Sequence, residues 1–269
     1  MLRQRIITAL IIAPIALACV FLLPPFEFSL FVAAVLIVCG WEWGNLAGLT
    51  SFFRFVYATF VGISIFGVSF LPADWVLAGS LIWWLAALVM VVMYPKLDRA
   101  WGSKVVVMFI GFLALVPGWV ALSQLKLLEH SSYFICLLLF LIWGADIGAY
   151  FTGKKLGRHK LAPRVSPGKT WEGFFGGLIV VLVIAALMST WFGRPQLGSV
   201  GGVILLVTTI GIGMVSVLGD LTISMFKRHR DIKDSSNLLP GHGGFLDRID
   251  SLLSASPVFA LYLLSVDWI

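Results

Sequence analysis

The sequence has few charged side chains for its length. Of its 269 residues, 12% are charged and 60% are hydrophobic, and the mean hydropathy is +1.01. A soluble domain carries about 25% charged residues, so a chain with half that supply is not expected to form one. The apolar residues instead gather in long runs, at 6–23, 28–40, 55–71, 75–93, 105–122, 133–151, 173–192, 199–219 and 252–266.

These runs have the length of membrane-spanning helices. Several approach the ~20 residues that a helix needs to cross the hydrocarbon core. The bilayer offers no water to backbone groups, so each run must satisfy its own hydrogen bonds as a helix. The sequence therefore predicts an all-α polytopic membrane protein with about nine transmembrane helices and long cytoplasmic loops at 152–171 and 227–251. The first run also resembles a secretory signal peptide, but it continues to Leu23, which favours a transmembrane helix.

Cysteine is scarce and unpaired. Cys19, Cys39 and Cys136 lie singly inside apolar runs, and the chain has no CxxC pair. This pattern excludes a disulfide framework. The three thiols are expected to pack as small hydrophobic groups.

Basic residues are almost missing from one side of the expected membrane topology. With nine crossings, Lys126 and Arg194 fall on one side and seventeen basic residues on the other. The seventeen are Arg3, Arg5, Arg54, Lys96, Arg99, Lys104, Lys154, Lys155, Arg158, Lys160, Arg164, Lys169, Lys227, Arg228, Arg230, Lys233 and Arg248. The positive-inside rule then places the N-terminus and the long loops in the cytoplasm. Topology explains most of the net charge of +6, so no nucleic-acid partner is expected.

The chain has no internal repeat or low-complexity tract, but its two halves differ. Residues 1–130 consist of apolar spans with short connections and are interpreted as a transmembrane scaffold. Residues 131–269 hold both long loops and two acids inside or beside spans, Asp146 and Asp220, and are interpreted as the catalytic half. An intramembrane carboxylate costs about 2.5–3.5 kcal/mol on insertion scales, so each needs a partner. We expect either a salt bridge that fastens helices or a shared cation in a polar cavity.

Polar groups accumulate at the end of the eighth run and in the loop that follows. The spacing of Asp220, Ser224 and Lys227 places them near one helix face. The turn "PGHGG" at 240–244 has glycines that can bring backbone N–H groups close to an anion. Asp247 and Asp250 share a face if the last helix has begun there. Carboxylates with phosphate oxygens are the surroundings that Mg²⁺ prefers, so the set indicates phosphoryl or nucleotidyl transfer.

The loop at 152–171 contains "GKT", which invites a P-loop interpretation. That motif needs glycine where the chain has Pro163, and no strand is expected before it. Thr170 is a candidate N-cap of the next span, with Glu172 favoured in its first turn. Ser166 and Lys169 remain candidates for binding a phosphate group near that helix N-terminus.

The stretch "SMFKRHRDIKDSSNLLPGHGGFLDRID" (224–250) resembles the signature of the phosphatidate cytidylyltransferases, also called CDP-diglyceride synthases. The matching positions are Ser224, Lys227, Arg228, Lys233, Asp234, Ser236, Pro240, His242, Gly243, Gly244, Asp247, Arg248 and Asp250. The segment "WGADIGAYFTGKKLGRHKLAPRVSPGKTWEG" (143–173) is also similar to that family. The resemblance spans essentially the whole chain and is diffuse before about residue 130.

The resemblance implies that CTP and phosphatidic acid react to CDP-diacylglycerol and pyrophosphate, with Mg²⁺ required. It further implies a cytoplasmic active site, a bacterial inner membrane location and a homodimer. By the same resemblance, Asp220 and Asp247 would bind the metal; Asp146 and Asp250 are further candidate ligands, and a second cation is an alternative.

Roles follow for the remaining residues. We expect Lys227, Arg228, Lys233, Arg248 and the turn from His242 to Gly244 to neutralise the phosphates and the leaving group. The candidate substrate-binding residues are Ser166, Lys169, Ser224, Lys233, Asp234, His242, Gly243 and Gly244. The sequence leaves open whether Ser166 and Lys169 meet the lipid head group or the triphosphate.

Two other functions remain as alternatives. A CTP-dependent kinase for a polyprenol-type lipid would share the membrane, the metal and CTP, but would release CDP. A cation-coupled transporter would use Asp146, Glu172 and Asp220 as its ion path. That interpretation leaves the 227–250 loop unexplained, and no inverted repeat is present.

Overall fold

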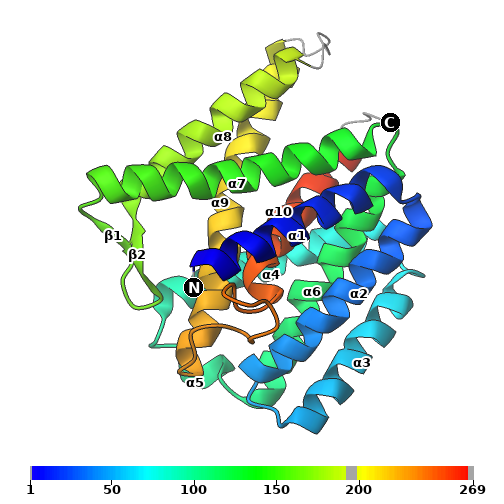
Figure 1. Cartoon of the computed structure of the whole chain (residues 1–269), viewed down its shortest axis with the longest axis vertical. Coiled ribbons are helices and arrows are strands. Elements are labelled where there is room, and N and C mark those ends of the chain that lie inside the picture. The colour runs from blue at the N-terminus through cyan, green and yellow to red at the C-terminus, as the bar shows by residue number, and fades with distance from the viewer. Residues whose placement is uncertain (1, 192–198, 266–269) are drawn as a thin grey trace.

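The computed structural model describes the backbone of residues 2–191 and 199–265, and the side chains of residues 8, 10–188 and 206–265. Arg3, Arg5 and Arg194, which contribute to the predicted orientation, lie outside the described side chains. The helices are α1 (Leu2–Leu22), α2 (Pro25–Leu46), α3 (Ser51–Val68), α4 (Ala73–Met93), α5 (Asp98–Trp101), α6 (Lys104–Leu127), α7 (Ser131–Leu156), α8 (Trp171–Trp191), α9 (Ser199–His229) and α10 (Leu246–Ser265) (Figure 1).

Each predicted apolar run has most of its residues in a long helix of its own, which confirms the class of polytopic helical membrane protein. Within the described ranges, seven helices are long and apolar enough to cross a membrane: α2, α3, α4, α6, α7 and the described parts of α8 and α9. In α1 the apolar stretch with described side chains is shorter and runs from Leu10 to Leu22. The start of α10 is polar, with Asp247, Arg248 and Asp250 in its first turns, and α10 is not among the seven.

The loop predicted at 152–171 is shorter and more ordered than expected. Helix α7 continues to Leu156, and the chain then forms a small antiparallel hairpin of β1 (Lys160–Ala162) and β2 (Ser166–Thr170). The expectation that no strand precedes "GKT" was therefore wrong, because these residues themselves end β2. Proline and glycine in this stretch hide the alternating pattern by which a strand is usually recognised.

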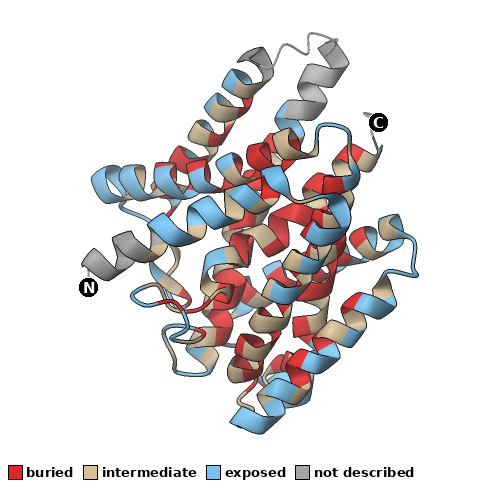
Figure 2. Cartoon of the chain, turned by 45° about the vertical axis from the view of Figure 1, so that its right-hand side comes forward, coloured by how far each residue is buried: buried red, intermediate tan, exposed pale blue. Residues whose placement is uncertain are grey.

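The helices enclose a core of apolar and aromatic side chains (Figure 2). Helices α2, α3 and α6 pack together at one side, and α10 packs against α4, α6 and α9. Trp43 of α2 donates its indole N–H to the Val107 carbonyl of α6 at 2.7 Å, and the Tyr57 hydroxyl of α3 donates to the Met108 carbonyl at 2.7 Å. Because α10 packs against α4 and α6, helices from 1–130 and from 131–269 share one bundle. The proposed division between scaffold and catalytic half stays a prediction.

Helices α7 and α8 approach each other closely through small residues. A Cβ atom on Gly173 would lie 2.8 Å from the Ala149 carbonyl oxygen, and one on Gly177 would lie 2.7 Å from that of Ala145. These obstacles are backbone atoms, which cannot swing aside as a side chain can. Small residues commonly let membrane helices pack backbone to backbone in this way. The hairpin connects α7 to α8, so this close contact between the two helices also fixes the position of the hairpin.

Replacing Gly177 with alanine is expected to destabilise the protein by about 1–3 kcal/mol, because the new methyl group overpacks the α7–α8 contact. Gly79 in α4 provides a matched control, since a Cβ atom there would meet nothing within 4 Å. Gly79→Ala should leave stability unchanged or raise it, as alanine is the better helix former. Unfolding of the detergent-solubilised variants measures both effects, and equal stability of the two would contradict the prediction.

Candidate active site

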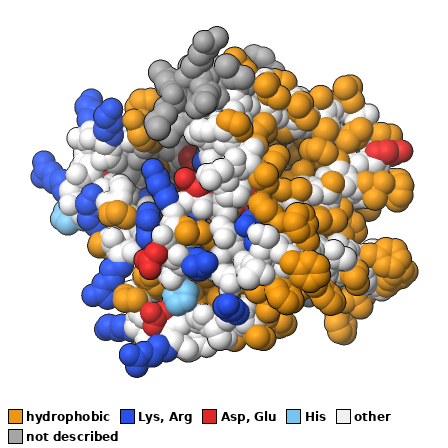
Figure 3. Space-filling view, turned by 60° about the horizontal axis from the view of Figure 1, so that its bottom comes forward, with side chains coloured by type: hydrophobic (Ala, Val, Ile, Leu, Met, Phe, Trp, Pro, Cys, Tyr) orange, Lys and Arg blue, Asp and Glu red, His pale blue; other side chains and the backbone are white. Residues whose placement is uncertain are grey.

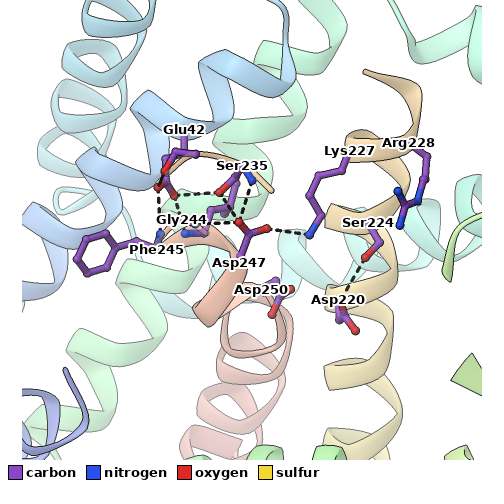
Figure 4. Close-up of polar contacts among 12 residues, drawn as sticks. Glu42, Asp220, Ser224, Lys227, Arg228, Ser235, Gly244, Phe245, Asp247 and Asp250 are labelled. Carbon is purple, nitrogen blue, oxygen red and sulfur yellow. Dashed lines mark hydrogen bonds and ion pairs between the residues drawn. The ribbon is translucent and has the colours of Figure 1, made fainter. Parts of the chain in front are cut away.

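Helices α9 and α10 meet at the polar loop that joins them. Lys227 lies in the last turn of α9 and Asp247 in the first turn of α10, which suits the charges at the two helix ends. Their side chains form an ion pair, with 2.8 Å between Lys227 Nζ and Asp247 Oδ1 (Figure 4). The two side chains are only 13% and 3% exposed. A buried ion pair therefore joins the two ends of the loop between α9 and α10.

The second carboxylate oxygen of Asp247 organises the loop. Asp247 Oδ2 accepts hydrogen bonds from Ser235 N at 2.8 Å, Ser235 Oγ at 2.9 Å and Gly244 N at 2.9 Å. Oδ2 thus takes three of the four hydrogen bonds described for this carboxylate, and Oδ1 takes the one from Lys227. We had expected the N–H groups of the glycine turn to face phosphates. The Gly244 amide instead binds the protein's own carboxylate.

Asp247 lies before the apolar part of α10 and is held in its charged form. Burial acts to raise the pKa of its carboxyl group. The ion pair with Lys227 and the hydrogen bonds from Gly244 and Ser235 outweigh burial, and the pKa lies below its usual value. Asp247 is thus an anion at neutral pH that keeps the Lys227 ammonium in place.

A second ion pair joins α9 to the hairpin. Ser224 Oγ donates to Asp220 Oδ1 at 3.2 Å, which confirms the shared face predicted from their spacing. Lys169 of β2 reaches Asp220 Oδ2 at 2.5 Å, with the two side chains 24% and 30% exposed. The sequence had placed Lys169 only near a helix N-terminus. The fold carries its ammonium across to α9.

The other two candidate carboxylates lie near Asp220. Asp250, 8% exposed, follows Asp247 by one turn of α10, and its charge interacts with that of Asp220. Asp146 on α7 interacts electrostatically with Asp220, Lys169 and Arg248. The three carboxylates therefore interact around Asp220, where Lys169 and Lys227 supply positive charge. Two features expected for the intramembrane acids are present: Asp220 forms a salt bridge, and Asp146 borders a cavity. A cation shared by the two acids stays a prediction.

A cavity of about 410 Å³ opens between α7, α8, α9 and the hairpin. Asp146, Ser166 and Lys169 line it with polar groups, and Tyr150 and Phe174 are among the apolar side chains that line it. Space with charged groups and aromatic walls among membrane helices suits a ligand that is part anion and part hydrocarbon.

The remaining predicted residues lie around these two ion pairs. Arg228 donates from Nε to the Val165 carbonyl at 3.2 Å and so ties α9 to the hairpin. Lys233, Asp234 and Arg248 are exposed. His242 donates its backbone N–H to the Leu239 carbonyl, and Gly243 has a φ of +83°, which glycine adopts without strain. In Figure 3 basic side chains gather on one side of the face and hydrophobic ones on the other, as a protein at a membrane surface requires.

The start of α8 is capped as expected. Thr170 Oγ1 accepts a hydrogen bond from Gly173 N at 3.1 Å, which confirms Thr170 as the N-cap. Glu172 in the first turn accepts hydrogen bonds from the backbone N–H groups of Arg158 and His159 and pairs with the His159 ring. These contacts close the base of the hairpin that carries Lys169.

The sequence reasoning missed Glu42 of α2. Its side chain is fully buried, and it accepts hydrogen bonds from Phe245 N at 3.0 Å and Leu246 N at 2.6 Å, at the start of α10 (Figure 4). A signal was available, because a single acid within the apolar 28–46 region demands a partner as Asp146 and Asp220 do. The partners, Phe245 and Leu246, lie about two hundred residues later, and the sequence around Glu42 does not identify them.

Known proteins resemble this chain, two of those named here over nearly its whole length. A sequence model described as the cytidylyltransferase family matches residues 3–266. A phosphatidate cytidylyltransferase of Pseudomonas aeruginosa is 48% identical, over 100% of this chain and 99% of the relative. One from Haemophilus influenzae is 40% identical, over 97% of this chain and 98% of the relative. One from Bacillus subtilis is 39% identical, over 58% of this chain and 59% of the relative.

The matched region contains both ion pairs, the hairpin and the loop from α9 to α10. The sequence signature, the buried charges and the extent of the match agree. The chain belongs to the cytidylyltransferase family.

Proposed function

We propose that the chain transfers the cytidylyl group of CTP to phosphatidic acid, giving CDP-diacylglycerol and pyrophosphate for phospholipid synthesis. The names of its full-length relatives support this reaction. The observation that carries it is the convergence of Lys169–Asp220 and Lys227–Asp247 beside a cavity among membrane-spanning helices. A reaction between a nucleotide and a membrane lipid needs such a site at the membrane surface.

The chemistry requires charge neutralisation more than a base. An oxygen of the phosphatidate phosphate attacks the α-phosphorus of CTP, and the bond from that phosphorus to the bridging oxygen of the β-phosphate breaks. The nucleophile is already anionic near neutral pH, so no strong general base is needed. Repulsion between two anions is the main barrier. In the proposal Lys227 and Arg228 neutralise the triphosphate and the departing pyrophosphate, with the exposed Lys233 and Arg248 at the rim.

The cavity is proposed to receive the lipid. Its polar wall, with Ser166 and Lys169, would bind the phosphatidate head group, while its apolar wall borders the membrane-spanning helices that the acyl chains would follow. The nucleotide would then approach from the loop between α9 and α10. The lipid phosphate would then meet Lys169 and the triphosphate would meet Lys227, so each anion would have its own lysine to screen its charge.

Mg²⁺ is proposed as the cofactor, and the donor chemistry fits it. Among the described residues no three His, Cys, Asp or Glu side chains lie close enough to form a metal cluster. Mg²⁺ nevertheless usually binds through one or two carboxylates together with substrate phosphates and water. Asp220 would supply one carboxylate, with Asp247 as the partner expected from the resemblance and Asp250 or Asp146 as further donors. Bound there, the metal would screen the phosphates and polarise the α-phosphorus.

Location and assembly complete the proposal. We propose that the protein lies in a bacterial inner membrane with the site facing the cytoplasm, as the distribution of basic residues predicts. A homodimer is proposed from the family resemblance. Labelling of single cysteines placed at exposed Lys160 and at Glu129 in intact cells tests the orientation, because the two positions should face opposite sides. Light scattering of the detergent-solubilised protein tests the dimer.

One assay tests the function. The purified protein is given CTP and Mg²⁺ in detergent, with phosphatidic acid in one reaction and a polyprenol in a parallel one, and the products are separated. We expect CDP-diacylglycerol and pyrophosphate. A folded protein that makes neither would refute the proposal, and release of CDP with a phosphorylated polyprenol would instead identify a lipid kinase. Omission of Mg²⁺ should abolish turnover.

A further inference from the structure

The loop between α9 and α10 is seated on helix α2, far from the two ion pairs in sequence. Glu42 of α2 is 0% exposed. Its Oε1 accepts from Ser236 Oγ at 2.5 Å and from Phe245 N at 3.0 Å, and its Oε2 accepts from Leu246 N at 2.6 Å. Two of these donors are backbone amides at the N-terminus of α10, where a negative charge is favoured.

A second side chain of α2 holds the same loop. Asn45, three residues after Glu42 and on the same helix face, donates from Nδ2 to the Ser235 carbonyl at 2.9 Å. Gly244 lies so close that a Cβ atom there would collide with the carboxylate of Glu42 and the hydroxyl of Ser235. The close packing of Gly244 on Glu42 and the hydrogen bond from Asn45 to Ser235 therefore fix the position of the loop on α2.

The loop residues that touch Glu42 also touch Asp247. Ser235 Oγ lies 3.4 Å from Glu42 Oε2 and donates to Asp247 Oδ2 at 2.9 Å. Gly244, packed against Glu42, donates its N–H to the same Asp247 oxygen. Two carboxylates thus grip one loop from opposite sides (Figure 4), and only Asp247 extends to Lys227. If Glu42 lost its contacts, the donors that fix Asp247 would shift with the loop.

We propose that Glu42 is a positioning residue for the reaction: through Ser235 and Gly244 it fixes the orientation of Asp247, and thereby the place of the Lys227 ammonium group. The inference rests on the proposed cytidylyl transfer. It assigns a functional role to a helix that the sequence interpretation treated as scaffold. Glu42 contacts no substrate in this role and acts only through the loop.

Glu42→Gln is the first test, because glutamine keeps the size of the side chain. Its amide N–H₂ replaces one accepting oxygen and would face the hydrogen-bond donors that bind Glu42. Turnover should fall about 10- to 100-fold, as expected when buried donors lose an acceptor. The Michaelis constant for phosphatidic acid should stay within about twofold, because uniform binding is untouched. Glu27→Gln is the matched control: Glu27 is an exposed acid in the first turn of the same helix and should retain wild-type turnover.

Two further measurements separate positioning from a general structural role. Hydrogen exchange should speed up in the peptide covering 235–246 and stay unchanged in the hairpin at 160–170. In a double-mutant cycle, Ser235→Ala should lose less in the Glu42→Gln background than in the wild type, because both act on Asp247 through the same contact. Additive losses, or faster exchange throughout the protein with normal turnover per folded molecule, would overturn the proposal.

Failure of the inference is distinguishable from failure of the function. An inactive but folded wild type would refute cytidylyl transfer itself. An active wild type with an equally active Glu42→Gln variant would refute only the role of Glu42. Should Glu42→Gln not accumulate, Asn45→Ala removes the neighbouring contact to Ser235 and leaves no unpaired charge. It must then show reduced turnover and faster exchange at 235–246, and normal values for both would overturn the proposal.

Discussion

Asp247→Asn is expected to lower the turnover of CDP-diacylglycerol formation by about 100- to 1,000-fold, the usual loss when a group that stabilises transition-state charge is displaced. Asparagine can still accept hydrogen bonds from Ser235 and Gly244 through its one carbonyl oxygen. Its amide N–H₂ would then face the Lys227 ammonium group, donor against donor. Lys227, only 13% exposed, would leave the place where it is proposed to bind phosphate.

The control for this prediction is Asp231→Asn. Asp231 is exposed in the same loop and has a φ of +53°, which asparagine tolerates. It should keep wild-type turnover under the same assay with CTP, phosphatidic acid and Mg²⁺. Asp247→Asn with more than a tenth of wild-type turnover would contradict the prediction.

A double variant shows how Asp247 acts. Lys227→Met should lose about as much turnover as Asp247→Asn, and the two together should lose little more, because they form one ion pair. An additive loss would instead show that Asp247 acts apart from Lys227, as a ligand of the cation would. The same measurement therefore tests the metal role that the sequence resemblance implies for Asp247.

The membrane helices were predictable because the bilayer leaves little choice. An apolar run of sufficient length has to satisfy its own hydrogen bonds, so runs such as 75–93 and 105–122 mark α4 and α6 closely. Local spacing also predicted the contact from Ser224 to Asp220, since residues four apart on a helix are neighbours. Both inferences depend only on residues close in sequence.

The parts that failed depend on partners distant in sequence. Arg228 binds the Val165 carbonyl in the hairpin, and Glu172 binds the backbone N–H of Arg158 just before β1. Neither contact leaves a pattern in the strands themselves. Lys169 was expected at a helix N-terminus, but the hairpin carries it to Asp220. Glu42 contacts a loop about two hundred residues away. No pattern in a single sequence predicts which of these distant residues are in contact. A charged residue within an apolar run indicates only that a partner must exist.

Lys169→Met and the double variant Lys169→Met/Asp220→Asn are expected to separate stability from activity. Lys169 is the only ion-pair partner of Asp220 among the described residues, and Asp146 and Asp250 lie close by with like charge. Breaking a fully buried pair costs about 3–5 kcal/mol. These side chains are 24% and 30% exposed, so we expect a loss of about 1–3 kcal/mol in Lys169→Met. Neutralising Asp220 as well should restore most of that stability.

Activity should not return with stability. The double variant lacks both the ammonium proposed to bind the lipid phosphate and the carboxylate proposed to bind Mg²⁺, so turnover should stay at least about 100-fold below wild type. Lys160→Met, an exposed lysine of β1 in the same hairpin, is the control and should change neither quantity. Unfolding in detergent and product formation measure the two effects separately. If turnover recovered together with stability, the Lys169–Asp220 pair would only fasten the hairpin to α9, and the catalytic cation would have to lie elsewhere.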